Sequence, residues 1–256
     1  MTATPRRNLL VGLLALGGGY AVLRTGTAAY GRLTGMDLAY EPMEWPEGFR
    51  KLVAGSTSSG GFDPFVGLDA PATPDRAVDT AAVEADPCGA LFGGPLDSGI
   101  VPIASFSDYN CPFCRVLTQR LAAYEAAEDG VRVVWHELPI LGDGSRAAAR
   151  AALAAKRQGA YVAFHERLMR SPFEPTDEYL RVLAADLGID ADRLAADMAS
   201  DAVADEIATS LALARGLATV GTPVLVIGRT VIEGAPDMDT IKRIVAEERE
   251  QPPICA

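Results

Sequence analysis

A Cys-Pro-Phe-Cys segment at residues 111–114 constrains the fold of this chain more than any other feature. It follows a short apolar run at 100–106 and precedes apolar residues at helical spacing, which end near Gly130. Cysteines at positions i and i+3 of a helix lie close enough for a disulfide to form and break with little backbone movement. Pro112 suits the first helical position, where the missing N–H has no partner to lose. The pattern predicts a buried strand and then a helix that begins at a cysteine pair.

The start of a helix would change the chemistry of Cys111. Unpaired N–H groups and the positive end of the helix dipole stabilise a thiolate and lower its pKa. Cys114 comes one turn later, where we expect a more buried thiol that resolves disulfides formed at Cys111. The sequence therefore predicts a redox-active pair that needs no cofactor beyond its own disulfide.

Metal binding is the alternative use of two neighbouring thiolates, as in a copper or zinc chaperone. Such a site needs more ligands than two cysteines. The two histidines of the chain, His136 and His165, show no ligand spacing with the pair. We therefore expect no metal at the cysteines.

The rest of the folded region has the order of an α/β protein. The patterns predict further strands at 131–135, 224–227 and 230–232, an alanine-rich helical block over about 145–219, and a closing helix over 237–249. A strand, helix and strand at the first spacing indicate a parallel βαβ unit. The order β-α-β, helical block, β-β-α is that of a thioredoxin fold with a helical insertion between its βαβ unit and its C-terminal ββα unit.

Gly221-Thr222-Pro223 comes directly before the third strand. Proline at a strand start can be an ordinary edge residue. In a thioredoxin fold the proline is instead expected to be cis. The backbone of Thr222 would then lie beside the cysteines, where it could hydrogen-bond an extended substrate segment. We expect Pro112, Phe113, Thr222 and Pro223 to support the cysteine pair and to contact substrate.

Three segments together resemble the DsbA family of bacterial envelope oxidoreductases: 107–110 with the cysteines that follow, 137–142 and 221–223. The resemblance runs from about residue 98 to 249. It implies an enzyme, a protein thiol–disulfide oxidoreductase, in which Cys111 is the nucleophile, Cys114 resolves the mixed disulfide and Pro223 is the cis-proline. It also implies two kinds of partner: reduced or misoxidised exported polypeptides, and a DsbB-like or DsbD-like membrane redox partner.

The chain departs from that family at two places. Several members of the superfamily carry an acidic residue six positions before the first cysteine, and here that residue is Ser105. Glu137 is a candidate substitute for moving a proton, although we expect it to be a surface residue at a strand end. The Pro-Phe dipeptide also lacks the histidine of strongly oxidising relatives. We therefore expect a lowered pKa at Cys111 with an intermediate oxidising strength.

The direction of the reaction is open to two interpretations. Isomerases generally need an oligomerisation module, and the segment before residue 98 has no heptad repeat. This favours an oxidase. Thr222 before the proline also occurs in isomerases of the superfamily, so a disulfide reductase or isomerase is the alternative.

The N-terminal third predicts export to the bacterial periplasm. Arg6 and Arg7 precede an uncharged apolar run at 9–23, which is typical of a signal sequence or a signal anchor over 1–29. We expect an arm and linker over 30–97 and the folded domain over 98–256. The large apolar residues of the arm are expected to dock on the main domain, and a small partner-binding patch is the alternative; they are Trp45, Phe49, Phe62, Phe65 and Leu68. The net charge of −11 makes nucleic acid a poor partner.

Cys88 and Cys255 flank the main domain. In an oxidising compartment we expect them to pair, which would tie the N-terminal arm to the C-terminal end. The alternatives are two free thiols, or a disulfide that shuttles electrons to the active pair.

Overall fold

A computed structural model describes residues 38–53, 56–58, 80–94, 99–171 and 174–255. Tyr40–Ala256 forms one compact unit. The predicted export segment at 1–29 lies outside the described residues. Within the described ranges, no helix is both long enough and apolar enough to cross a membrane.

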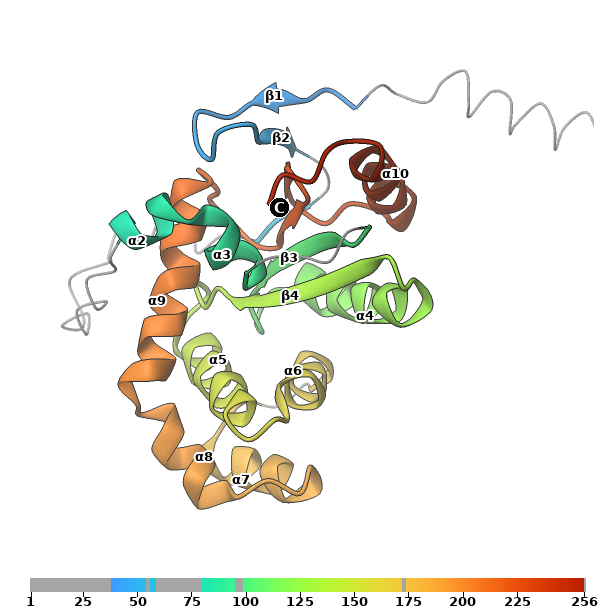
Figure 1. Ribbon diagram of the computed structural model, residues 1–256. Helices are drawn as coiled ribbons and strands as arrows, with labels where there is room; N and C mark the ends of the chain where they lie inside the picture. The colour runs from blue at the N-terminus through green and yellow to red at the C-terminus, as the bar shows by residue number, and fades with distance from the viewer. Residues whose placement is uncertain (1–37, 54–55, 59–79, 95–98, 172–173, 256) are drawn as a thin grey trace, which may run out of the picture. The chain divides into compact units, whose positions relative to one another are not determined.

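One mixed sheet of six strands forms the centre of the unit, in the order β1-β2-β6-β5-β3-β4 (Figure 1). β3 runs parallel to β4 and antiparallel to β5, and β5 is antiparallel to β6. All seven residues of β3 are buried, as expected for a central strand in an apolar run. The strands are β1 (Glu41–Pro42), β2 (Arg50–Val53), β3 (Val101–Ser107), β4 (Val131–Glu137), β5 (Val224–Ile227) and β6 (Thr230–Glu233).

The helices confirm the predicted fold class. α4 connects the two parallel strands, α5 to α9 are inserted before β5, and α10 follows the final hairpin (Figure 1). The helices are α2 (Thr80–Ala85), α3 (Pro87–Phe92), α4 (Pro112–Ala127), α5 (Asp143–Lys156), α6 (Tyr161–Arg170), α7 (Asp177–Asp186), α8 (Ala191–Met198), α9 (Asp201–Gly216) and α10 (Met238–Arg249). This arrangement is a thioredoxin fold with a helical insertion.

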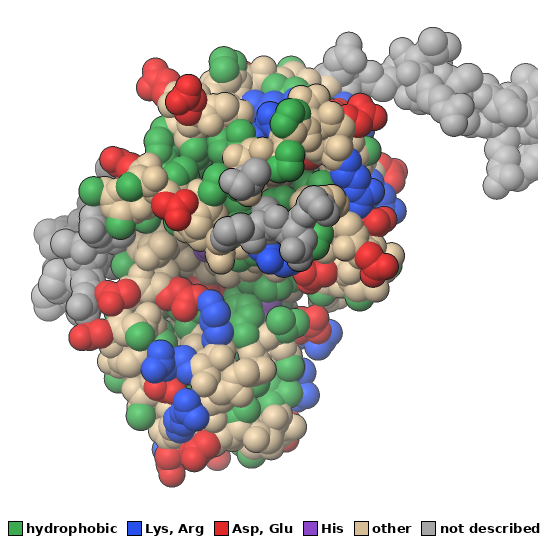
Figure 2. Space-filling view, viewed as in Figure 1, with side chains coloured by type: hydrophobic (Ala, Val, Ile, Leu, Met, Phe, Trp, Pro, Cys, Tyr) green, Lys and Arg blue, Asp and Glu red, His purple; other side chains and the backbone are tan. Residues whose placement is uncertain are grey.

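The inserted helices pack closely because α5 carries so many small residues. Seven alanines or serines of α5 and Leu153 are buried, and small side chains allow neighbouring helices to approach. Ion pairs join the outer faces of the block, such as Lys156 with Glu206 at 2.5 Å and Arg157 with Asp197 at 3.0 Å. Acidic and basic side chains are interspersed over the face of the molecule that Figure 2 shows.

The segment expected to be an arm contributes two strands to the sheet. β2 pairs in parallel with β6, with Arg50 opposite Thr230, and β1 pairs antiparallel with β2. Phe49 is buried and Trp45 packs beside it in the same hydrophobic cluster as Phe106 and Leu213. The docked apolar residues Phe62, Phe65 and Leu68 of the prediction lie outside the described residues.

Cys88 and Cys255 form a disulfide with an S–S distance of 2.01 Å. The bond joins α3 to the C-terminal segment across a sequence separation of 167 residues. Cys255 is buried in the cluster that contains Phe49. The bond therefore ties the helix before β3 to the C-terminal end.

Candidate active site

Cys111 is the N-cap residue of α4. Its backbone is extended, and its Sγ accepts a hydrogen bond from the amide of Cys114 at 3.2 Å. Pro112 occupies the first turn, where no intrahelical donor is needed. Both cysteines are buried free thiols in this structure, so the site is in its reduced form.

These contacts shift the pKa values of the two thiols in opposite directions. Hydrogen bonding from the Cys114 side chain, with further contributions from Thr222, the Cys114 amide and Ser58, lowers the pKa of Cys111 to about 6 although burial opposes this. Burial, together with the neighbouring Cys111 sulfur, raises the pKa of Cys114 well above its usual range. Near neutral pH, Cys111 is a thiolate and Cys114 is the protonated partner that stabilises it.

The peptide bond between Thr222 and Pro223 is cis. The carbonyl oxygen of Thr222 lies 3.5 Å from Sγ of Cys111. Thr222 and Cys111 are separated by 111 positions in the chain, and β3 and β5 bring them together as antiparallel neighbours. Pro112 is exposed and Phe113 is half-buried beside them. All six residues expected at the site thus lie in one region.

Asp108 stabilises the loop before the cysteines through hydrogen bonds. The sequence analysis did not predict this role. The carboxylate is completely buried. It accepts hydrogen bonds from the amides of Asn110, Ile140 and Leu141 at 2.7 to 2.9 Å, and from the Ser145 hydroxyl at 2.5 Å. It therefore joins the segment that precedes Cys111 to the start of the helical insertion. An acidic residue directly after a buried strand was the available signal.

Glu137 is buried, so the expectation of a surface residue at a strand end is wrong. Its Oε1 accepts hydrogen bonds from the hydroxyls of Tyr109 and Tyr161, both at 2.7 Å, and lies 3.2 Å from Nδ1 of His165. The side chains of Glu137 and His165 are each 1% exposed. α6 of the helical insertion supplies Tyr161 and His165, so the insertion helps to bury the end of β4.

The buried polar cluster is not a typical metal site. Burial and the nearby Glu137 carboxylate raise the pKa of Tyr109 and of Tyr161 well above the usual range, so both phenols remain protonated donors. Over the described ranges, no group of three or more histidine, cysteine or acidic side chains is placed to hold a metal ion. His136 is elsewhere, stacked on Phe106.

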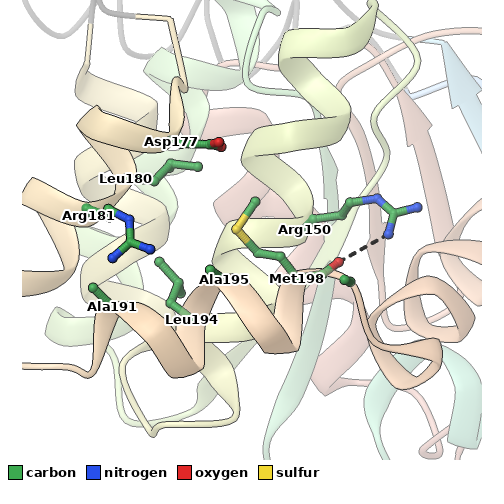
Figure 3. Close-up of a pocket in the computed structure, with 9 residues that line it drawn as sticks. Arg150, Asp177, Leu180, Arg181, Ala191, Leu194, Ala195 and Met198 are labelled. Carbon is green, nitrogen blue, oxygen red and sulfur yellow. Dashed lines mark hydrogen bonds between the residues drawn. The ribbon is translucent and has the colours of Figure 1, made fainter.

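A separate cavity of about 390 Å³ lies within the helical insertion (Figure 3). Leu180 and Leu194 line it from α7 and α8, and Arg150 reaches across from α5 to donate a hydrogen bond to the Met198 carbonyl at 3.1 Å. None of its lining residues belongs to the cysteine site. The cysteine pair therefore lies outside this cavity, at the start of α4.

The model of the DSBA-like thioredoxin domain family matches residues 102–246. That span is more than half of the chain and contains the cysteine pair, the inserted helices and Pro223. The chain belongs to this family. The family and the fold make the domain a thiol–disulfide oxidoreductase, and the resemblance noted in the sequence is confirmed.

Solved structures of related proteins have the same fold. A thioredoxin-like oxidoreductase from Silicibacter pomeroyi matches with a TM-score of 0.60 and 36% identity, over 64% of this chain and 99% of that one. The thiol-disulfide exchange protein alpha-DsbA2 from Wolbachia pipientis matches at 0.58 and 26%, over 70% and 99%. A periplasmic thioredoxin-like protein from Salmonella enterica serovar Typhimurium matches at 0.53 and 30%, over 64% and 95%.

A curated relative is of another kind. The Na(+)/H(+) antiporter NhaA 3 of Salinispora tropica is 26% identical over 165 residues, which are 64% of this chain and 25% of the antiporter. The chain thus spans about a quarter of the length of that relative, and the likeness concerns that part alone.

Proposed function

We propose that this DsbA-like domain is an oxidase that transfers its Cys111–Cys114 disulfide to other exported proteins. The observation that carries the proposal is the position of Cys111 as the N-cap of α4, where the Cys114 amide donates to Sγ at 3.2 Å and the pKa of the thiol is lowered to about 6. A stabilised Cys111 thiolate favours the reduced form of the pair and makes its disulfide more oxidising. It is also a good leaving group, which speeds the second step of the exchange.

The proposed reaction has two steps. A substrate thiolate attacks Sγ of Cys111, the Cys111–Cys114 bond breaks, and Cys114 leaves as a thiolate that takes up a proton because burial disfavours its charge. A second substrate thiolate then attacks the substrate sulfur of the mixed disulfide and releases Cys111 as a thiolate. The substrate loses two electrons and the pair gains them.

Four neighbouring residues have proposed supporting roles in substrate binding. The main chain of Thr222, held by the cis bond to Pro223, would pair with an extended segment of the substrate. Pro112 is exposed and Phe113 half-buried next to Cys111, so both would contact the substrate close to its sulfur. No cofactor is proposed beyond the disulfide itself.

The proposed setting is the bacterial envelope, with export directed by the N-terminal segment at 1–29. The periplasmic relative from Salmonella enterica supports this location. Reduced exported polypeptides would be the substrates. A membrane redox partner, DsbB-like for an oxidase, would accept the two electrons that each cycle leaves on the pair.

The deciding experiment is the reduction potential of the pair against glutathione buffers, with a Cys111→Ser variant as the baseline. We expect a value between those of thioredoxin, about −270 mV, and DsbA, about −120 mV. A value at or below that of thioredoxin would contradict the oxidase and support a reductase, with a DsbD-like partner that supplies electrons.

A further inference from the structure

Residues 56–58 lie along the edge at which a substrate would bind. The amide of Ser58 donates to the Thr222 carbonyl at 2.6 Å, and the amide of Thr222 donates to the Ser58 carbonyl at 2.7 Å. The two residues form an antiparallel β-bridge. An extended polypeptide that pairs with Thr222 would make the same two hydrogen bonds, so the chain's own backbone occupies that position.

Two further contacts direct this segment toward the site. β2 pairs with β6 up to Val53 opposite Glu233. Beyond it, the amide of Ala235 donates to the Ser56 carbonyl at 3.0 Å. Ser56 thus lies just beyond the end of β6, and Ser58 lies beside Thr222.

Gly221 makes room for the segment. A Cβ at position 221 would lie 2.8 Å from the carbonyl oxygen of Ser58, closer than real Cβ contacts allow. The Ser58 backbone therefore approaches the strand at a distance that only glycine permits. Such a close approach of two backbones indicates that the segment packs specifically against Gly221 and Thr222.

The segment lies close to the nucleophile, because the Thr222 carbonyl oxygen that accepts the Ser58 amide at 2.6 Å lies 3.5 Å from Sγ of Cys111. Hydrogen bonding from the Ser58 side chain is one of the contributions that lower the pKa of Cys111. At the same time Cys111 is 0% exposed. A substrate sulfur cannot contact a fully buried Sγ, so some part of the surroundings has to move before exchange begins.

We propose that residues 56–58 are a built-in pseudosubstrate: they occupy the polypeptide-binding edge at Thr222, and an extended substrate segment must displace them to reach Cys111. This inference rests on the proposed function, since it names the regulation of the same site. Substrates that can form the antiparallel pair with Thr222 compete for the edge. Small molecules that cannot form it must wait for spontaneous release of the segment.

The first test removes one hydrogen bond from the segment. Ser58→Pro deletes the N–H that binds the Thr222 carbonyl, and the control Ser58→Ala keeps this N–H while losing the same hydroxyl. The readout is the rate of Cys111 alkylation by iodoacetamide on the high-pH plateau, where the thiol is ionised in both variants. We expect Ser58→Pro to react about fivefold faster than Ser58→Ala, as for the loss of one net hydrogen bond. Equal rates would overturn the proposal.

The second test traps the segment in place. In a Cys114→Ala background, Ser58→Cys puts a thiol beside Sγ of Cys111. Glutathione disulfide then oxidises the two thiols to an intramolecular disulfide and is itself reduced to two glutathione thiols. The control is Thr57→Cys in the same background, because neighbouring side chains on an extended segment point to opposite sides.

Mass spectrometry of the trapped protein separates the outcomes. A crosslink between position 58 and Cys111, with little or none from position 57, supports the pseudosubstrate. No crosslink from either position, or equal crosslinking from both, overturns it. Neither test uses a protein substrate. If the wild-type protein fails to exchange disulfides with a dithiol peptide, the proposed function fails on that assay alone, and the crosslink still decides whether residues 56–58 occupy the edge.

Discussion

The amide nitrogen of Cys114 lies 3.2 Å from Sγ of Cys111, so the first cysteine caps the helix that carries the second. The cap places a backbone donor, and with it the positive end of the α4 dipole, at the sulfur that ionises. Burial acts in the opposite direction on Cys111 and dominates at Cys114. The same helix start thus separates the acidities of two cysteines that are three residues apart.

The pH profile of alkylation tests this separation directly. In the reduced protein we expect the rate of Cys111 modification by iodoacetamide to rise with a midpoint near pH 6, because only the thiolate reacts. Cys114 should remain unmodified over the same range. A Cys114→Ala control should shift the midpoint upward, since the Cys114 side chain is the largest stabilising contribution. A wild-type midpoint above pH 8 would contradict the assignment.

The lowered pKa also makes the stability of the reduced form depend on pH. The folded pKa of Cys111 is about 6 and the unfolded value about 8.5, so the unfolded chain binds more protons between them. The stabilisation is fully present above the unfolded value and is lost as the pH falls through 6. From pH 8 to pH 6, the free energy of unfolding should fall by about 2 kcal/mol relative to a Cys111→Ala variant. Urea unfolding in the presence of reductant measures it, and parallel curves for the two proteins would refute the linkage.

The disulfide between Cys88 and Cys255 should stabilise the domain without taking part in exchange. It closes a loop with a sequence separation of 167 residues, for which the chain-entropy model gives about 5 kcal/mol. We expect the double variant Cys88→Ala, Cys255→Ala to lose 2 to 5 kcal/mol of unfolding free energy, about the usual range, while its active pair keeps the wild-type potential. A shifted potential would instead support electron transfer between the two disulfides.

The buried carboxylate of Glu137 should contribute more to the free energy of unfolding than a surface carboxylate would. Glu137→Ala removes the carboxylate that accepts from the buried hydroxyls of Tyr109 and Tyr161. Among the described residues, it leaves Nδ1 of His165 as the one polar atom near both hydroxyls. We expect a loss of about 3 kcal/mol in urea unfolding, against about 1 kcal/mol for Tyr161→Phe, which removes a single donor. A loss below about 0.5 kcal/mol would be that of an exposed side chain.

The cysteine site was predictable from local sequence because its chemistry depends on neighbours in the chain. Residues 111–114 contain both sulfurs and the proline of the first turn, and the apolar run before them forms β3 at nearly the predicted bounds. The turn between the strands predicted at 224–227 and 230–232 is equally local, because Gly228 there has a positive φ, which glycine adopts without strain. Such features need little information from distant parts of the molecule.

The burial and the hydrogen-bond partners of Glu137 and Asp108 could not be predicted from their neighbours in the sequence. The sequence places Glu137 at the end of a strand, where exposure is the usual state. The tyrosines and the histidine that bury it come from the loop before α4 and from α6, up to 28 positions away in the chain. Three of the four donors to Asp108 likewise come from more than 30 residues later, at Ile140, Leu141 and Ser145. Periodicity carries no signal for such contacts.

By itself the sequence determined the pair of thiols, the helix that begins at Cys111, the order of helices and strands from β3 to α10 and the family to which the chain belongs. Only the tertiary structure decided that β2 extends the sheet beside β6 and that Ser58 seats against Thr222. The physical reason is that a strand of four residues and a single β-bridge have almost no local preference of their own. Their positions are set by the unpaired N–H and C=O groups of a strand more than 160 residues away in the chain.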